Sequence, residues 1–125
     1  MKKFTFNNRK IAVIGLGYVG LPLAVNFAKK RFVVGFDTDN TRIVSLLRGY
    51  DETKEVDTQE LEKASFLEFT SNPRLLKTAS IYIIATPTPV DDANQPDLGP
   101  LKAATKTVGK YIDAGDVVIF ESTVY

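Results

Sequence analysis

"IAVIGLGYVGLPLA", residues 11–24, is the stretch that decides the fold of this chain. Four apolar residues lead into three closely spaced glycines, Gly15, Gly17 and Gly20, and apolar residues at helical spacing follow. A short apolar run that stops at a glycine is typical of a buried strand. Because Pro22 is tolerated only in the first turn of a helix, a helix is expected to begin close to Tyr18. The stretch therefore predicts a strand, a tight turn and a helix.

The glycines have the spacing G-x-G-x-x-G of the dinucleotide-binding fingerprint. In that pattern Gly15 allows the tight turn, Gly17 lets a pyrophosphate approach the backbone, and Gly20 lets the helix pack closely on the strand. The helix N-terminus adds N–H groups and a partial positive charge for the phosphates. A glycine-rich turn that binds no ligand is the alternative interpretation.

The rest of the chain alternates between apolar runs and segments with helical spacing. Strands are expected at 32–36, 66–69, 81–85 and 117–121, with helices between them and a brief one after Pro73. Buried strands that alternate with helices predict a parallel sheet covered on both faces. Right-handed crossovers make this an α/β, Rossmann-like, doubly wound sheet of about five strands in the order 3-2-1-4-5.

Asp37 ends the second apolar run, where the fingerprint places an acidic residue. A carboxylate there accepts hydrogen bonds from both adenosine ribose hydroxyls and repels a 2′-phosphate, which favours NAD over NADP. A turn residue after a strand is the alternative for Asp37. Asp39 and Asn40 are interpreted as helix caps. Arg42 is expected either beside the adenine or ribose, or on a solvated helix face.

Residues 86–99, "TPTPVDDANQPDLG", form a proline-rich loop directly after the expected fourth strand. The carboxyl ends of parallel strands share one edge of the sheet, so this loop and the glycine turn are expected together. The prolines stiffen a loop that presents Thr hydroxyls and backbone groups to a cofactor, with a rigid turn as the alternative. Ser122 and Thr123 follow the fifth strand at the same edge. Glu121 is either an acid–base group or a strand-end carboxylate.

Composition excludes several kinds of function. The 125 residues, about one domain's worth of chain, include no Cys and no His, and the net charge is +1. The chain therefore offers no disulfide, thiolate or imidazole chemistry, and we expect no metal site. The charge gives no reason to expect nucleic acid or an acidic membrane as partner. Because neither a secretory signal nor a membrane span is recognisable, a cytoplasmic location is expected.

Four segments together resemble the UDP-glucose/GDP-mannose dehydrogenase family: "GLGYVGLPLA", "GFDTDNTRI", "TPTPVDDANQPDLGPL" and "ESTVY". The loop with "QPDL" is the most specific of them. It is similar to the branch that oxidises UDP-N-acetylhexosamines for capsule or O-antigen synthesis, as in Vi-antigen biosynthesis. The resemblance spans roughly residues 10–125 and covers only the family's N-terminal NAD-binding domain. We therefore expect residues 1–125 to be a truncated fragment without the central helix and the C-terminal UDP-sugar domain.

The resemblance implies an enzyme that oxidises the C6 alcohol of a UDP-sugar to a carboxylate, with two hydride transfers to two NAD+. It also implies a homodimeric full-length protein. In the family, a cysteine of the C-terminal domain traps the aldehyde intermediate. That Cys, the catalytic Lys and the downstream Glu are missing from these residues, so we expect this chain alone to bind NAD and to oxidise no sugar.

Matched by motif, the resemblance also implies which residues hold the cofactor. They are Gly15, Leu16, Gly17, Tyr18, Val19, Gly20, Asp37, Arg42, Thr86, Pro87, Thr88, Ser122, Thr123 and Val124. Of these, the segment Ser122–Val124 would reach towards the nicotinamide. Thr123 resembles the family's threonine that helps to position the catalytic water, so it is the one predicted catalytic residue.

Two other interpretations share the glycine loop. One is a freestanding nucleotide-sensing module, like the Rossmann-type regulatory domains of potassium transport systems, which have no reason to carry the "TPTP" loop with "PDLGPL". The other is a dehydrogenase of the 6-phosphogluconate or hydroxyisobutyrate kind. Those enzymes often prefer NADP, against which Asp37 argues.

Overall fold

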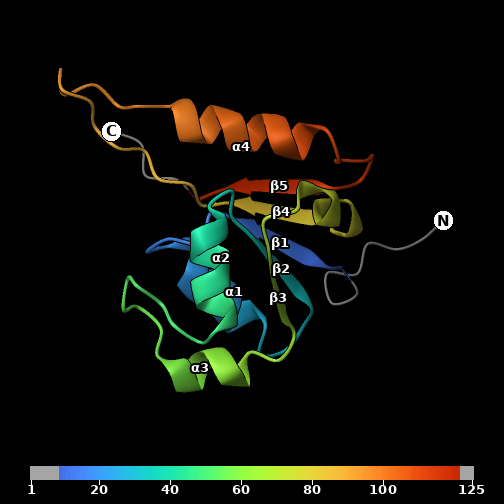
Figure 1. The fold of residues 1–125 in the computed structure, drawn as a ribbon. Coiled ribbons are helices and arrows are strands. Elements are labelled where there is room, and N and C mark those ends of the chain that lie inside the picture. Colours follow the sequence, from blue (N-terminus) through green and yellow to red (C-terminus); the bar gives the residue numbers. More distant parts are fainter. Residues whose placement is uncertain (1–8, 122–125) are drawn as a thin grey trace.

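A computed structural model describes residues 9–121 of the chain (Figure 1). Five parallel strands form one sheet in the order β3-β2-β1-β4-β5, which confirms the predicted order. The strands are β1 (Ile11–Ile14), β2 (Val33–Phe36), β3 (Leu67–Thr70), β4 (Ile81–Ile84) and β5 (Val117–Phe120). In the register, Ile11 lies between Val33 of β2 and Ile81 of β4, so β1 is the central strand.

Helices cover both faces of the sheet. The helices are α1 (Gly20–Phe27), α2 (Asn40–Leu47), α3 (Thr58–Lys63), the 3₁₀ helix η2 (Pro73–Thr78) and α4 (Gly99–Gly109). The first three pack on one face, whereas η2 and α4 pack on the other. Figure 1 shows α4 and α3 on opposite sides of the sheet. Among the described residues, no helix has the length and the apolar character needed to cross a bilayer.

The apolar core has two halves, because successive residues of a strand point to opposite faces. Ile11 and Val13 pack against the side of α1, α2 and α3, whereas Ala12 and Ile14 pack against η2 and α4. All four residues of β1 are buried, as expected for a central parallel strand. The edge strand β5, which pairs only with β4, is less covered than predicted, and Phe120 is 56% exposed.

The helix boundaries differ from the prediction at several points. Helix α1 begins at Gly20, close to Tyr18 as predicted, with Pro22 in its first turn. Helix α2 is capped by Asp39, whose Oδ1 accepts hydrogen bonds from the backbone N–H groups of Thr41 and Arg42. Asn40 is thus the first helical residue rather than a cap. The helix after Pro73 has 3₁₀ geometry.

Candidate dinucleotide-binding site

A cavity of about 400 Å³ lies at the carboxyl edge of the sheet. Its walls come from the ends of β1, β2 and β4 and from one side of α4. The lining residues are Ile14, Gly15, Leu16, Gly17, Phe36, Asp37, Thr38, Asp39, Arg42, Thr86, Pro87, Pro100, Ala103, Ala104 and Thr107. A volume of this size is typical of small-molecule sites.

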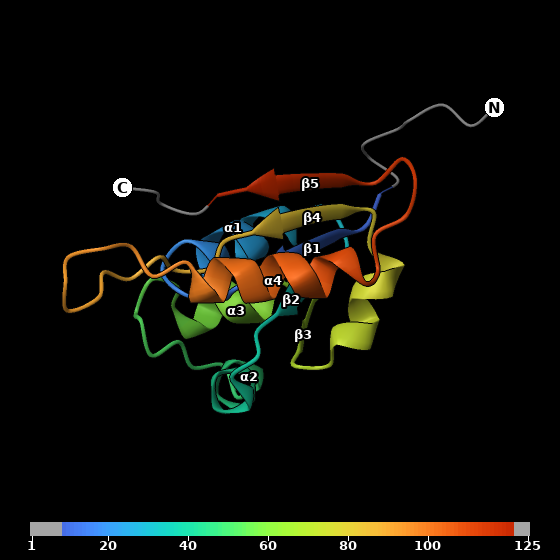
Figure 2. The ribbon, with the colours of Figure 1, turned by 90° about the horizontal axis from the view of Figure 1, so that it is seen from above.

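The position of the cavity follows from the topology of the sheet. Strand β1 leads to α1 on one face, and its neighbour β4 leads to α4 on the other. The cavity therefore lies at the switch point of the sheet, where doubly wound folds bind ligands. Figure 2 shows the loop between β4 and α4 extending beyond this same edge.

The three glycines of the turn after β1 differ in what surrounds them. Gly15 has a φ of +97°, a conformation that side chains rarely adopt. A Cβ added to Gly20 would overlap the carbonyl oxygen of Gly15, so the helix packs on the turn at a distance that only glycine allows. A Cβ added to Gly17 would meet no atom of the described residues within 4 Å. Residues 9–121 thus leave the space beside Gly17 empty, next to a cavity.

The start of α1 also fits an anionic ligand. Its N-cap, Val19, provides no side-chain hydrogen bond to the first turn of the helix. Backbone N–H groups at a helix start have no partner within the helix and carry a partial positive charge. In α2, by contrast, Asp39 fills this position with its carboxylate. Two neighbouring helices of one face therefore differ at their N-termini, and the uncapped one follows the glycine turn.

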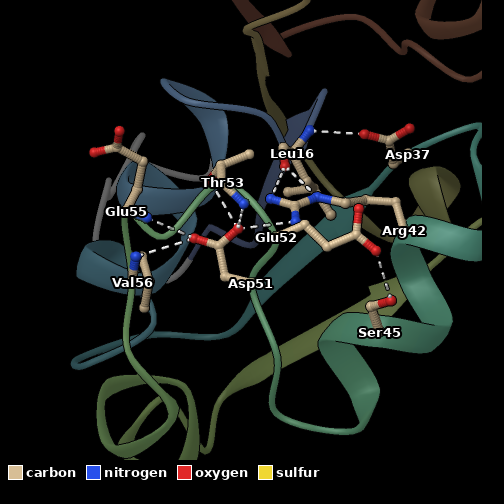
Figure 3. A network of polar contacts seen from close by, with 9 residues as sticks. All are labelled: Leu16, Asp37, Arg42, Ser45, Asp51, Glu52, Thr53, Glu55 and Val56. Carbon is tan, nitrogen blue, oxygen red and sulfur yellow. Dashed lines mark hydrogen bonds and ion pairs between the residues drawn. The ribbon is translucent and has the colours of Figure 1, made fainter.

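Asp37 follows β2 and joins two segments at the cavity. Its Oδ2 accepts a hydrogen bond from the N–H of Leu16 at 3.0 Å (Figure 3). Its Oδ1 accepts one from the N–H of Asp39 at 3.0 Å. Each carboxylate oxygen has two lone pairs, so both retain capacity for a further donor. Asp37 thus fixes the glycine turn and still offers an acceptor at the cavity wall.

Arg42 is buried, so its interpretation as a solvated helix-face cation is wrong. Its Nε and Nη2 donate hydrogen bonds to the carbonyl oxygen of Leu16, at 2.9 and 2.6 Å. Its Nη1 pairs with Oδ1 of Asp51 at 2.8 Å. Periodicity alone did not indicate this burial, because the partner Asp51 lies in the irregular segment that follows α2 (Figure 3).

Thr86 follows β4 and lines the cavity beside Pro87. Its Oγ1 is buried and has no hydrogen-bond partner among residues 9–121. A buried hydroxyl of this kind carries a desolvation cost that a polar ligand atom removes. The orphaned hydroxyl, the empty space at Gly17 and the acceptor of Asp37 all fit a dinucleotide with a pyrophosphate and ribose hydroxyls.

The structure brings half of the predicted cofactor residues to the cavity. Those that line it are Gly15, Leu16, Gly17, Asp37, Arg42, Thr86 and Pro87. Leu16 offers only its backbone, because its side chain is fully buried in the core. Those outside the lining are Tyr18, Val19, Gly20 and Thr88. Ser122, Thr123 and Val124 lie outside the described residues.

The wall formed by α4 was missed in the sequence analysis. Pro100, Ala103 and Thr107 line the cavity at helical spacing. Their spacing of three and then four residues is typical of one face of a helix. The preceding loop has no periodicity, however, so the sequence did not indicate that this helix lies at the carboxyl edge of the sheet. Glu121 follows β5, is exposed and does not line the cavity.

A family model for the NAD-binding domain of the UDP-glucose/GDP-mannose dehydrogenase family matches residues 9–125. The chain belongs to this family. Its domain is the NAD-binding domain, as the resemblance implied. Membership favours the nucleotide-sugar dehydrogenase interpretation over a freestanding sensing module and over the 6-phosphogluconate or hydroxyisobutyrate kind.

Individual relatives of this family agree with the assignment. The chain is 55% identical over 116 residues to a UDP-N-acetyl-D-glucosamine 6-dehydrogenase from Pseudomonas aeruginosa, covering 93% of this chain and 28% of that protein. It is 51% identical over 122 residues to the enzyme of the same name from Salmonella typhi, covering 98% of this chain and 29% of that protein. This chain therefore spans less than a third of the length of these relatives.

A solved structure shows the same fold. The UDP-D-ManNAc dehydrogenase from Pyrococcus horikoshii matches with a TM-score of 0.85 and 36% sequence identity. The match covers 92% of this chain and 28% of that chain.

Proposed function

We propose that this chain binds NAD+ in the cavity at the carboxyl edge of the sheet. The observation that carries the proposal is the space beside Gly17, which no atom of residues 9–121 fills, in a cavity that Gly17 and the carboxylate of Asp37 line and that the uncapped start of α1 follows in the chain. The glycine turn would hold the pyrophosphate, and Asp37 would accept hydrogen bonds from the adenosine ribose. The carboxylate would also repel a 2′-phosphate, so NAD+ is preferred to NADP+.

The remaining contacts in this proposal follow the walls of the cavity. Arg42 would lie against the adenosine, and Thr86, Pro87 and Thr88 would line the cofactor. The buried Oγ1 of Thr86 supports this assignment because it lacks a partner within the part of the chain that the structure describes. Ser122, Thr123 and Val124 are assigned to the nicotinamide side from the family motif alone, and Thr123 keeps its predicted role beside the catalytic water.

We further propose that the domain serves an enzyme that oxidises the C6 alcohol of a UDP-N-acetylhexosamine to the uronic acid, in the synthesis of a surface polysaccharide. The names of the relatives from P. aeruginosa and S. typhi support this substrate class. Bound NAD+ supplies the hydride acceptor. The nucleophile and most of the sugar contacts would come from the part of those relatives that has no counterpart here, so this chain alone is proposed to be inactive. A homodimeric full-length enzyme in the cytoplasm belongs to the same proposal.

Calorimetric titration of this chain with NAD+ and NADP+ tests the first proposal. We expect NAD+ to bind and NADP+ to bind at least about tenfold more weakly, since each 1.4 kcal/mol of repulsion is tenfold in affinity. Asp37→Asn should weaken NAD+ binding and reduce the discrimination. Glu62→Gln, which removes one negative charge at an exposed position on α3, is the control. It should change neither the affinity for NAD+ nor the discrimination against NADP+. Absence of NAD+ binding, or equal binding of both nucleotides, would contradict the proposal.

A further inference from the structure

Asp51 lies outside the cavity lining, yet it is linked to the glycine turn through one side chain. Its carboxylate is fully buried and pairs with Nη1 of Arg42 at 2.8 Å. The same guanidinium donates two hydrogen bonds to the carbonyl oxygen of Leu16. Figure 3 shows this sequence of contacts, from Asp51 through Arg42 to Leu16.

The chain around Asp51 is folded to hold its carboxylate in one position. Oδ1 accepts hydrogen bonds from the N–H and the Oγ1 of Thr53, at 2.9 and 2.7 Å. Oδ2 accepts hydrogen bonds from the N–H groups of Glu55 and Val56, both at 3.0 Å. Lys54, in the same turn, has a φ of +59°, which is unfavourable for a residue with a side chain. The turn is therefore maintained by the bonds to Asp51.

The contact with Leu16 bears on Gly17 through the geometry of the peptide bond. The carbonyl of Leu16 and the N–H of Gly17 belong to one planar peptide group, in which the two point in opposite directions. When Arg42 fixes the carbonyl, it also fixes the direction of the Gly17 N–H. The N–H of Leu16 is held in turn by Asp37, so the peptide planes on both sides of Leu16 are set by charged side chains.

We propose that Asp51 is a positioning residue for the cofactor: through Arg42 it orients the Leu16–Gly17 peptide so that the Gly17 N–H faces the pyrophosphate. This inference rests on the proposed binding of NAD+ in the cavity. A buried ion pair is weak evidence for stability in itself, and it is better explained where it selects one geometry. Here the selected geometry is that of the turn whose neighbouring space is empty.

The test compares ligands with and without the pyrophosphate. In Asp51→Asn, the new amide donor would face the N–H groups of Glu55 and Val56, so the carboxylate's arrangement is lost. We expect the affinities for NAD+ and for ADP to fall about tenfold, and that for adenosine to fall less than about twofold, because adenosine has no pyrophosphate for the Gly17 N–H to face. Amide NMR spectra of the free chain should show a shifted Gly17 resonance.

Asp57→Ala is the matched control for lost stability. Asp57 caps α3 by accepting a hydrogen bond from the N–H of Glu60, and it has no contact with Arg42. Its removal should lower the unfolding temperature while leaving the affinities for all three ligands and the Gly17 resonance unchanged. Thr53→Val, which removes only one donor to Asp51, is the milder variant for the case that Asp51→Asn does not fold, and it should show the same ligand pattern with a smaller amplitude.

The outcomes separate this inference from the proposed function. If the unsubstituted chain does not bind NAD+, the proposed function itself fails. If the unsubstituted chain binds NAD+, and the Asp51 and Thr53 variants bind NAD+ and ADP as tightly as it does, only the role of Asp51 is overturned. Equal losses for adenosine and ADP would likewise overturn it, because they would indicate general damage to the cavity.

Discussion

Gly20 lies directly against the carbonyl oxygen of Gly15, so that a Cβ at position 20 would overlap this oxygen. Gly17, between them, has open space where its Cβ would be. Two glycines of one motif thus differ in whether the fold requires them. Gly20 is required by the fold itself, whereas no described residue lies close enough to Gly17 to require that it lack a side chain.

Alanine at these two positions should therefore affect different properties: stability at position 20 and NAD+ binding at position 17. Gly20→Ala should lower the free energy of unfolding by about 3 kcal/mol, since the overlapping atom belongs to the backbone and cannot move aside cheaply. Gly17→Ala should leave the free energy of unfolding unchanged within about 1 kcal/mol. It should nevertheless weaken NAD+ binding about tenfold or more by displacing the pyrophosphate. Chemical denaturation and calorimetric titration of the two variants measure both quantities. A Gly17 variant with unchanged affinity would show that the pyrophosphate lies elsewhere.

Thr86→Val tests whether the orphaned hydroxyl serves a ligand. The Oγ1 of Thr86 is buried and has no partner among the described residues, so its replacement by a methyl group should leave the free chain as stable as before or more stable by about 1 kcal/mol. Affinity for NAD+ should fall about fivefold if the hydroxyl contacts the cofactor. A clear loss of stability in the free chain would instead mean that the hydroxyl has a partner in solution.

The stability contribution of Asp51 should depend on pH. Burial raises the pKa of Asp51, but hydrogen bonds from Thr53 and Val56 and the pairing with Arg42 outweigh this effect and keep the pKa below its ordinary value of 3.8. A carboxyl group whose pKa is lowered by folding stabilises the protein above its unfolded pKa, and this stabilisation is lost as the pH falls through the folded value. Asp51→Asn should cost about 2 kcal/mol at pH 7.

Denaturation of both proteins between pH 7 and pH 2.5 checks this sign. The difference in free energy of unfolding between the unsubstituted chain and Asp51→Asn should be constant down to about pH 5 and should shrink below pH 3.8. Other carboxyl groups titrate in both proteins and cancel in the difference. A difference that grows in acid would mean that folding raises the pKa of Asp51 instead of lowering it.

Tyr82 should matter for stability and not for the cofactor. Its hydroxyl is buried beneath η2 and donates to the carbonyl oxygen of Leu76 at 2.8 Å. The carbonyl oxygen of Ala79, at 3.1 Å, is a second acceptor for the same hydroxyl. Burial, and then the charges of Asp116 and Asp113, raise the pKa of Tyr82, so the hydroxyl remains a donor at neutral pH. Tyr82→Phe should cost about 1–2 kcal/mol in the free energy of unfolding.

Calorimetric titration of Tyr82→Phe should give the NAD+ affinity of the unsubstituted chain, because Tyr82 does not line the cavity. Tyr50→Phe is the matched control, since Tyr50 is 53% exposed and its replacement should change stability by no more than about 0.5 kcal/mol. A reduced affinity in Tyr82→Phe would indicate that the cavity depends on the packing of η2.

The sheet could be predicted from the sequence because its signals are local. A buried apolar run, a glycine turn and an acidic strand end each occupy a few consecutive residues, and the connection rules then leave few topologies. The environment of Arg42 could not be predicted in this way. Its burial depends on Asp51, which lies in a turn without periodicity and is brought to Arg42 only by the folded chain.

The α4 wall illustrates the same limit for the site. Residues at the cavity such as Ala103 and Thr107 carry no chemical signal of their own. They line the site only because the irregular loop after β4 returns the chain to the same edge of the sheet (Figure 2). Motifs therefore identified the residues that contribute backbone groups and charge, and the fold identified those that contribute shape.

Amide NMR spectra of this chain during titration with NAD+ test the central claim most directly. If NAD+ binds at the switch point, the amide resonances of Gly17, Asp37 and Thr86 should shift together. These residues follow the carboxyl ends of β1, β2 and β4, which meet at the cavity. The resonances of Phe32 and Phe66, which pack edge to face beside the opposite ends of β2 and β3, should stay unchanged. Shifts confined to other residues, or no shifts at all, would contradict the assignment of this cavity to the cofactor.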